Sequence, residues 1–229
     1  ALAAEIIRAG RTPVMLAGGV DVLCRLTYAG FNALQALDPE PCRPFDRERQ
    51  GLTLGEGAAV LVLEDADHAR ARGATAWARL AGHGMTADAH HLTAPRPDGA
   101  AAARALRDAL AASGTPPEAV DYVNAHGSGT QANDATETRI IKAVFGRRAY
   151  RIPISSTKSM IGHCLGAAGA LEALATVLAV RHDVIPPTLG LTHPDPDCDL
   201  DFVPHAARRQ PLETAVSNLY GFGGTNTSL

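Results

Sequence analysis

Residues 152–180 read IPISSTKSMIGHCLGAAGALEALATVLAV, a short apolar run followed by a polar loop and a long run of small residues. The apolar run Ile152–Ser155 predicts a strand. Gly166–Val180 predicts a helix, and its glycines and alanines would let the helix approach another backbone closely. The loop between them carries Lys158 and His163, so two chemically active side chains are expected beside a rigid strand and helix.

The same alternation of strands and helices continues on both sides of this stretch. Further strands are predicted at Pro13–Ala17, Ala58–Leu63, Trp77–Met85, Asp121–Asn124, Thr214–Ser217 and Thr225–Leu229. Further helices are predicted at Ala1–Ala9, Asp65–Arg72, Ala100–Ala112 and Asp134–Phe145, the last with Asn133 or Asp134 as its N-cap. Continuous apolar strands alternating with helices predict an α/β protein whose sheet is covered on both faces. The composition changes near Gly73–Ala76, and this stretch is the best candidate for a boundary between two parts of the chain.

Composition and charge exclude several classes of protein. Hydrophobic residues make up 46% of the 229 residues and charged residues 20%, which predicts a substantial core rather than disorder. The net charge of −3 gives no electrostatic case for nucleic acid. Gly169 and Glu172 interrupt the longest apolar run, Ala167–Val180, so no membrane span is expected. The four cysteines form no C-x-x-C pair, which favours a reducing compartment, the cytoplasm by default, and disfavours a zinc ribbon.

The first chemically suggestive loop is NAHGSGT, from Asn124 to Thr130, directly after a predicted strand. His126 would be held at the strand end while the glycines leave the backbone open to a ligand. In an extended segment, Ser128 and Thr130 point the same way and could bind a ligand that carries amides. The alternative is a turn whose hydroxyls cap the next helix.

The second loop, SSTKSMIGHCLGAAG, begins at Ser155 and contains Lys158 and His163. It lacks the glycine pattern of a phosphate-binding loop. Glu172 lies in the first two turns of the following helix, where the helix dipole favours a carboxylate, and it would neutralise a buried Lys158. The alternative is a solvated lysine beside glycines that serve packing alone.

The third loop, SNLYGFGGTN from Ser217 to Asn226, places Phe222 among three glycines. This pattern suits a mobile gate, because glycines permit rotation while a phenylalanine can close or open a cavity. A plain β-turn is the alternative.

Together the three loops resemble those of the β-ketoacyl synthases of the thiolase superfamily, in particular synthase II and the ketosynthases of type II polyketide pathways. Further stretches look like the family in the same order, namely Arg43–Arg47, Gly55–Gly57, Asp88–Pro95 and Cys198–Pro204. The resemblance covers essentially the whole chain.

The resemblance implies the thiolase fold, a five-layered α-β-α-β-α sandwich built from two similar α/β halves. Residues 1–73 look like the end of the N-terminal half, and residues 74–229 look like most of the C-terminal half. The nucleophilic cysteine of the family precedes the helix that opens this chain and is expected shortly upstream of Ala1. Cys164 is interpreted as a small packing residue beside His163.

The resemblance also implies decarboxylative Claisen condensation of an acyl group with a malonyl-carrier-protein, in fatty-acid or polyketide biosynthesis. His126 and His163 match the two histidines of the family and are expected to donate neutral Nε2–H groups to a thioester enolate. Lys158 matches the neighbouring lysine, paired with Glu172, and it organises the site rather than acting as a general base.

The remaining matches concern the carrier and the gate. Ser128 and Thr130 match the hydroxyls that hold the phosphopantetheine arm of the acyl carrier protein, and Phe222 matches the gate between the half-reactions. A backbone N–H near Phe222 is expected to help form an oxyanion hole. The implied assembly is a homodimer, or a heterodimer with a subunit resembling a chain length factor, and the enzyme itself is expected to bind no cofactor.

Other functions compete with this one. A non-catalytic partner of the chain-length-factor type is disfavoured because His126, Lys158 and His163 are all present. Degradative thiolases and chalcone-type synthases do not combine both histidine loops with the Thr157-Lys158 segment. A metal hydrolase is disfavoured as well, because there is no H-E-x-x-H motif and the adjacent His90 and His91 would point to opposite faces of a strand.

Overall fold

A five-stranded mixed sheet forms the centre of the computed structural model, which describes all of residues 1–229. Its strand order is β3-β9-β8-β4-β5, with β4 parallel to both β8 and β5 and with β9 antiparallel to β8 and β3. The strands are β3 (Gly84–Ala87), β4 (Tyr122–Asn124), β5 (Ile154–Ser155), β8 (Ala215–Gly221) and β9 (Thr225–Ser228).

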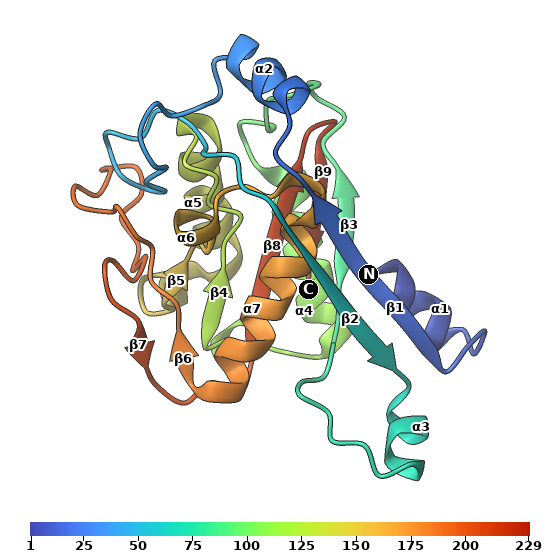
Figure 1. Cartoon of the computed structure of the whole chain (residues 1–229). Coiled ribbons are helices and arrows are strands. Elements are labelled where there is room, and N and C mark those ends of the chain that lie inside the picture. The colour runs from blue at the N-terminus through green and yellow to red at the C-terminus, as the bar shows by residue number, and fades with distance from the viewer.

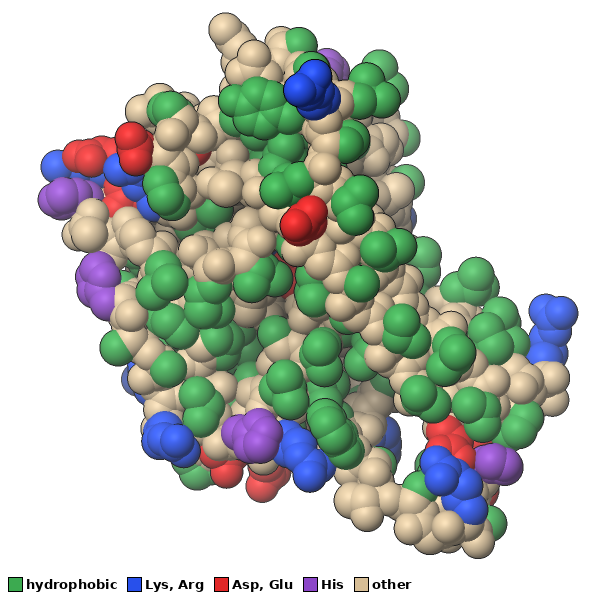
Figure 2. Space-filling view, in the orientation of Figure 1, with side chains coloured by type: hydrophobic (Ala, Val, Ile, Leu, Met, Phe, Trp, Pro, Cys, Tyr) green, Lys and Arg blue, Asp and Glu red, His purple; other side chains and the backbone are tan.

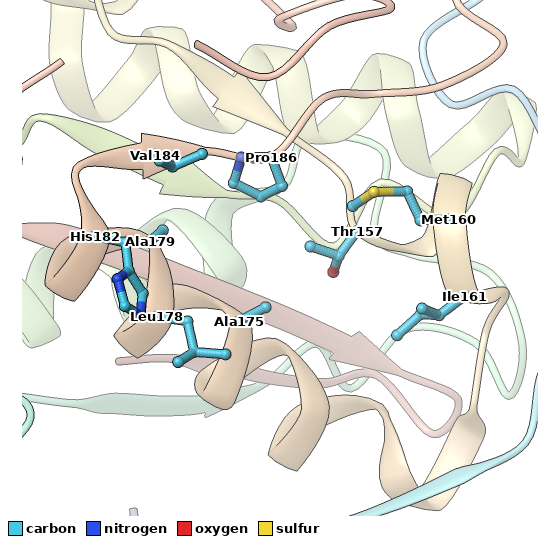
Figure 3. A pocket seen from close by; sticks show the side chains of 9 residues that line it. All are labelled: Thr157, Met160, Ile161, Ala175, Leu178, Ala179, His182, Val184 and Pro186. Carbon is cyan, nitrogen blue, oxygen red and sulfur yellow. The ribbon is translucent and has the colours of Figure 1, made fainter. Parts of the chain in front are cut away.

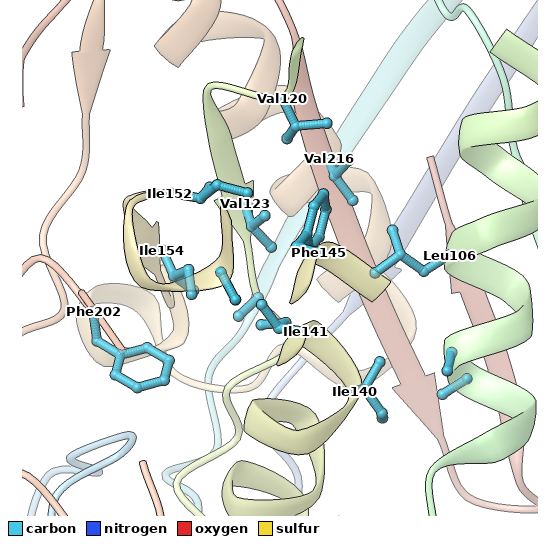
Figure 4. Packing of buried hydrophobic residues seen from close by; sticks show 14 of the residues in the cluster. Leu106, Val120, Val123, Ile140, Ile141, Phe145, Ile152, Ile154, Phe202 and Val216 are labelled. Atoms are coloured by element: carbon cyan, nitrogen blue, oxygen red, sulfur yellow. The ribbon is translucent and has the colours of Figure 1, made fainter. Parts of the chain in front are cut away.

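Helices cover both faces of this sheet. The helices α4 (Ala100–Ser113) and α5 (Gln131–Phe145) pack on one face, and α7 (Ala168–His182) contacts β8 on the other, as Figure 1 shows. The main core lies under α4 and α5, where aliphatic and aromatic side chains from both helices meet those of β4 and β8 (Figure 4). The sheet therefore has a rigid centre, and β4, which carries His126 at its end, is buried throughout.

A separate two-stranded ribbon lies on the other side of α7. It consists of β1 (Val14–Asp21) paired antiparallel with β2 (Gly57–Glu64), and both strands contact α7. Gly19 lies so close to the backbone of Gly166 that any Cβ would overlap the Gly166 carbonyl oxygen. The helix α7 is thus a layer between two sheets.

The outer face of the ribbon is apolar and exposed. Burial alternates along β1, and the side chains that point away from α7 include Leu16, Val20, Val60 and Val62, each of them largely exposed. Figure 2 shows hydrophobic side chains gathered over this part of the surface. The predicted strand at Pro13–Ala17 is confirmed as a strand, but the prediction that it is buried is wrong. The observed strand also continues four residues further, to Asp21.

The shorter elements connect these layers. They are α1 (Leu2–Arg8), α2 (Arg25–Ala33), α3 (Ala66–Ala71), α6 (Lys158–Ile161), β6 (Val184–Ile185), β7 (Arg208–Arg209) and the 3₁₀ turns Pro117–Ala119, Gly146–Tyr150 and Leu165–Ala167. The predicted helices at the positions of α1, α3, α4 and α7 are confirmed to within two residues at each end. The helix α2 was not predicted.

Two predicted elements differ from the structure. The strand predicted at Trp77–Met85 is wrong except at its end, because Trp77 instead lies under the Arg181 guanidinium, 4.7 Å from it, and the segment has no strand partner before Gly84. The helix α5 begins at Gln131 rather than at Asp134. The Asp134 carboxylate accepts the N–H of Phe45, so it ties α5 to a distant segment instead of capping it.

The segment Leu165–His182 is long and apolar enough to cross a membrane by length and composition, with a mean hydropathy of 1.2, and 22% of it is buried. Gly169 and Glu172, on which the expectation of no membrane span depended, thus do not bring the segment below this measure of length and composition. In the structure the segment includes α7, which lies between the ribbon and the five-stranded sheet and carries the fully buried carboxylate of Glu172.

Candidate active site

His126 lies just beyond the carboxyl end of β4, the central parallel strand. Its N–H and that of Gly127 donate to the two carboxylate oxygens of Glu137, at 2.9 and 2.8 Å. Glu137 is fully buried on α5, so the histidine loop is fixed from the helix that covers the sheet. Burial raises the pKa of Glu137 to about 7, although the two N–H donors work in the opposite direction.

His163 is held by a segment more than one hundred residues earlier in the chain. Its N–H donates to the carbonyl of Thr53 at 2.7 Å, and its own carbonyl accepts from Gly55 at 3.1 Å. Gly162 precedes it with a φ of +73°, a left-handed conformation that favours glycine. Gly55 has no room for a side chain, because a Cβ there would overlap the carbonyl oxygen of Ile161.

The structure brings the two histidines together. Their ring centroids lie 5.4 Å apart and the rings are inclined by 76°, an edge-to-face arrangement. Both rings line one cavity of about 710 Å³, together with Ser128, Thr130 and Phe222. The three predicted loops therefore meet at a single cavity.

Hydrogen bonds to the backbone fix the tautomer of both rings. The Nδ1 of His126 accepts from the N–H of Tyr220 at 3.3 Å, and the Nδ1 of His163 accepts from the N–H of Leu165 at 3.1 Å. An amide N–H can only donate, so each Nδ1 is unprotonated and each neutral ring carries its proton on Nε2. Both histidines are thus Nε2–H donors.

Burial also keeps both rings uncharged. It lowers the pKa of His126 well below its usual value, and the charge of Lys158 lowers it further. It lowers the pKa of His163 to about 3, with a smaller effect from Lys158 in the same direction. At neutral pH both groups are donors that carry no charge.

We expect ¹⁵N-histidine NMR to show His126 and His163 as Nε2–H tautomers throughout the range from about pH 5 to pH 8. Burial lowers the pKa of His126 well below its usual value and that of His163 to about 3, so neither ring should take up a second proton near neutral pH. The signals would be assigned with His126→Gln and His163→Gln, and free histidine in the same buffer gives the reference titration. A titration of either ring near pH 6.5 would contradict this assignment.

Lys158 and Glu172 form a buried ion pair behind the histidines. Each side chain is only 1% exposed, and the Lys158 Nζ donates to the Oε1 of Glu172 and, at 2.6 Å, to the carbonyl of His126. The same Nζ lies 3.4 Å from the His126 Nδ1. The alternative of a solvated lysine is wrong, because α7 brings Glu172 directly to it.

Ser128 and Thr130 lie side by side at the wall of the cavity. Their hydroxyl oxygens are 2.9 Å apart and hydrogen-bonded. Thr130 precedes α5, but its side chain makes no capping hydrogen bond to the helix. The structure therefore does not support the alternative in which these hydroxyls serve as helix caps, and both remain at the cavity surface.

Phe222 lies in the turn between β8 and β9 and is half exposed. Gly223 and Gly224 follow it with φ values of +81° and +76°. Its ring stacks on that of Phe31 from α2, with centroids 5.5 Å apart. The N–H of Phe222 has no hydrogen-bond partner, whereas the N–H of Gly223 donates to the carbonyl of Leu92 at 2.7 Å.

Several functional neighbours were not assigned to the site from the sequence. From α5, Glu137 accepts the N–H of His126 and Asp134 accepts the N–H of Gly129. In the sequence, these two acidic residues lie three positions apart shortly after the NAHGSGT loop, and this spacing could have indicated their contact with the loop. Asp88 accepts from the Asn226 side chain at 2.7 Å, which fixes the far side of the turn that carries Phe222. Phe31 belongs to the helix that the sequence analysis missed.

A possible metal cluster lies outside this cavity. Ligand atoms of Asp46, Glu48 and His193 lie within 4.8 Å of one another. Only Asp46 is buried, and its carboxylate already accepts the N–H groups of Glu48, Thr192 and His193 at 2.6–2.9 Å. Its evident role is to join two segments of the chain.

A second cavity of about 420 Å³ lies at the other end of α7. Figure 3 shows that mainly apolar side chains from α6, α7 and β6 line it, with His182 at one edge. None of the predicted site residues lines this second cavity, whereas five of them line the first, namely His126, His163, Ser128, Thr130 and Phe222.

Two family models match most of the chain. The C-terminal domain of β-ketoacyl synthase matches residues 77–192, and the N-terminal domain of β-ketoacyl synthase matches residues 1–69. The chain is 48% identical over 98% of its length to 3-oxoacyl-[acyl-carrier-protein] synthase 2 of Synechocystis, and 50% identical over its full length to nodulation protein E of Rhizobium meliloti. It covers 56% and 57% of these two relatives, little more than half of their length.

Solved structures show the same fold. One is a type II polyketide acyl-carrier protein in complex with its ketosynthase bound to the hexaketide, with a TM-score of 0.96 and 41% identity over 99% of this chain and 58% of that one. Another is a β-ketoacyl synthase from Burkholderia phymatum, with a TM-score of 0.94 and 43% identity over 99% of this chain and 56% of that one. The architecture is therefore that of the α/β thiolase-like sandwich, of which this chain forms part.

Proposed function

Because the chain belongs to the β-ketoacyl synthase family, we propose that it supplies the decarboxylation site of an acyltransferase that performs decarboxylative Claisen condensation on malonyl-carrier-protein. The observation that carries the proposal is the pair of neutral Nε2–H imidazoles, 5.4 Å apart, at one cavity. The relatives named as synthases and ketosynthases support the same reaction class.

The chemical need is to stabilise a thioester enolate. Loss of carbon dioxide from a malonyl thioester leaves a carbanion whose charge is delocalised onto the thioester oxygen. Donors already aimed at that oxygen need no reorganisation, and one such donor is typically worth about 2.7–4 kcal/mol. His126 and His163 provide two donors with no charge of their own, so the negative charge meets N–H dipoles in a largely buried site.

Lys158 acts as a positioning group in this proposal. Its ammonium is already bound by Glu172 and by the carbonyl of His126, so it has no free lone pair with which to accept a proton. It holds the backbone of His126 and sets the electrostatic field behind the ring. Glu172 balances its charge.

The nucleophile is proposed to be a cysteine just upstream of residue 1. Among the cysteines of this chain, Cys42, Cys164 and Cys198 are buried, and burial raises the pKa of each thiol above its usual value. A raised pKa disfavours the reactive thiolate. The fourth, Cys24, is exposed at the start of α2 and does not line the cavity.

The carrier-protein arm is proposed to enter past the two hydroxyls. Ser128 and Thr130 would hydrogen-bond the amides of a phosphopantetheine arm borne by an acyl carrier protein. Phe222 would act as the gate between acyl transfer and condensation, and its free N–H is a candidate oxyanion-hole donor. One matching structure is a ketosynthase with its carrier protein, which supports such a partner.

The assembly and the division of the chain are also proposals. A homodimer or a heterodimer with a subunit resembling a chain length factor is proposed, because solved relatives include ketosynthase complexes with chain length factors. Residues 1–73, with the β1–β2 ribbon, are proposed as the end of the N-terminal half, and residues 74–229, with the five-stranded sheet, as most of the C-terminal half. The cytoplasmic location stays a prediction.

The complete protein, with its upstream residues, is expected to form a β-ketoacyl thioester by itself from an acyl-carrier-protein thioester and malonyl-carrier-protein. Mass spectrometry of the thioester product and release of labelled carbon dioxide measure the reaction. A thiol-reactive inhibitor that binds in the cavity should label one cysteine upstream of Ala1, and the buried Cys42, Cys164 and Cys198 should remain unlabelled. Product formation only after addition of a second subunit that brings its own nucleophile would instead identify a non-catalytic partner.

A further inference from the structure

The aromatic stack between α2 and the gate turn joins two distant parts of the chain. Phe31 lies in the last turn of α2, and Phe222 lies in the turn between β8 and β9, 191 positions later. The two rings are nearly parallel, inclined by 23°, with centroids 5.5 Å apart. In Figure 1, α2 lies over this end of β8 and β9.

The backbone of the turn that carries Phe222 is hydrogen-bonded on both sides of this residue. Before it, the N–H of Tyr220 donates to the His126 Nδ1 at 3.3 Å, and the carbonyl of Gly221 accepts from Gly224 at 3.1 Å. The N–H of Gly223 donates to Leu92, and the carbonyl of Gly224 accepts from Asp88 at 2.8 Å. A Cβ added to Gly224 would press against Asp88, whereas one added to Gly223 would have nothing within 4 Å. The backbone is therefore held at Gly221, Gly223 and Gly224, while the N–H of Phe222 itself has no partner.

The Phe222 side chain has one aromatic partner. It is 50% exposed, its own N–H is free, and the stack on Phe31 is the only ring contact it makes. Without that stack, the glycines around Phe222 would allow several positions of the ring. The observed position of the gate thus depends on Phe31.

The helix α2 reaches the same cavity. None of its residues is buried, and its N-terminus is capped by Cys24, which accepts from the N–H of Thr27. Phe31 and Leu34, at its C-terminal end, line the cavity that contains both histidines. The stack therefore links this end of α2 to the turn that carries Phe222.

On the basis of the proposed function, we infer that Phe31 is a positioning residue that latches Phe222 in its observed place and so sets the order of the two half-reactions. While the stack is made, Phe222 stays at the wall of the cavity, and malonyl decarboxylation waits for acyl loading. When an acyl chain fills the cavity beside Phe31, the stack is broken and the gate turn is released. No covalent step is assigned to Phe31.

The test measures how often the complete enzyme decarboxylates malonyl-carrier-protein without condensation. An aromatic pair shifts an equilibrium by roughly two- to tenfold, so Phe31→Leu should raise the ratio of uncoupled decarboxylation to condensation by that factor. Phe31→Tyr keeps the ring and should restore the ratio of the original protein. Tyr28→Leu is the matched control, because Tyr28 is an exposed aromatic residue on the same helix.

A double-variant comparison separates a latch from a general loss of structure. Phe222→Leu should raise the same ratio, and Phe31→Leu combined with Phe222→Leu should raise it no further than either change alone, because both remove one interaction. Thermal unfolding of each variant monitors folding. A ratio unchanged in Phe31→Leu, or effects of the two changes that multiply, would overturn the latch while leaving the proposed function intact. Absence of decarboxylation and condensation in the unaltered protein would overturn the proposed function itself.

Discussion

Replacing His163 by alanine is expected to lower malonyl decarboxylation by the complete enzyme by at least about 10²–10³-fold, the loss that follows removal of one preorganised oxyanion donor. The Nδ1 of His163 is occupied by the N–H of Leu165, so its Nε2–H is the group offered to the cavity. Alanine removes that donor, and water in its place would have to be ordered for each reaction. The measurement is the rate of labelled carbon dioxide release at saturating malonyl-carrier-protein.

Two further variants show whether the lost donor is the cause. His163→Gln retains an N–H donor of similar reach and should fall between alanine and the original protein. His205→Ala removes an exposed histidine that does not line the cavity and should leave the rate unchanged. Decarboxylation at the original rate in His163→Ala would contradict the role given to the histidine pair, provided that the variant unfolds at the same temperature.

The local parts of the fold could be predicted from the sequence because short-range patterns determine them. The run of small residues after Gly166 predicts a helix that packs closely, and α7 does lie against β1 at Gly19. The three glycine-containing loops stand out because each follows or joins strands. Their convergence on one cavity, however, required the family resemblance, since no spacing in the sequence reports it.

The missed features depend on contacts between distant segments. Asp134 resembles a helix cap in the sequence, but its carboxylate binds the N–H of Phe45. Trp77 belongs to an apolar run that resembles a strand, but Arg181 from α7 provides its partner instead of another strand. The helix α2 gives a weak signal because none of its residues is buried. Such partners become visible only when the chain is folded.

Replacing Glu172 by leucine is expected to lower the free energy of unfolding by about 3–5 kcal/mol, the cost of leaving one member of a buried ion pair without its partner. The Lys158 ammonium would remain in a site where it is 1% exposed, with the carbonyl of His126 as its nearest acceptor. Water cannot reach the charge to replace the carboxylate. Chemical denaturation with linear extrapolation measures the change.

The double change Lys158→Met with Glu172→Leu distinguishes stability from function. Removing both charges takes away the unpaired ammonium, so the double variant should recover most of the lost stability. The decarboxylation rate of the double variant should be lower than that of the original protein, because no ammonium then holds the His126 carbonyl. Asp199→Asn breaks the partly exposed pair with Lys142 and should cost no more than about 1 kcal/mol, since water screens that pair. If the double variant were as unstable as Glu172→Leu, packing around α7 rather than the unpaired charge would account for the loss, and the ion pair would not hold the site in the way proposed.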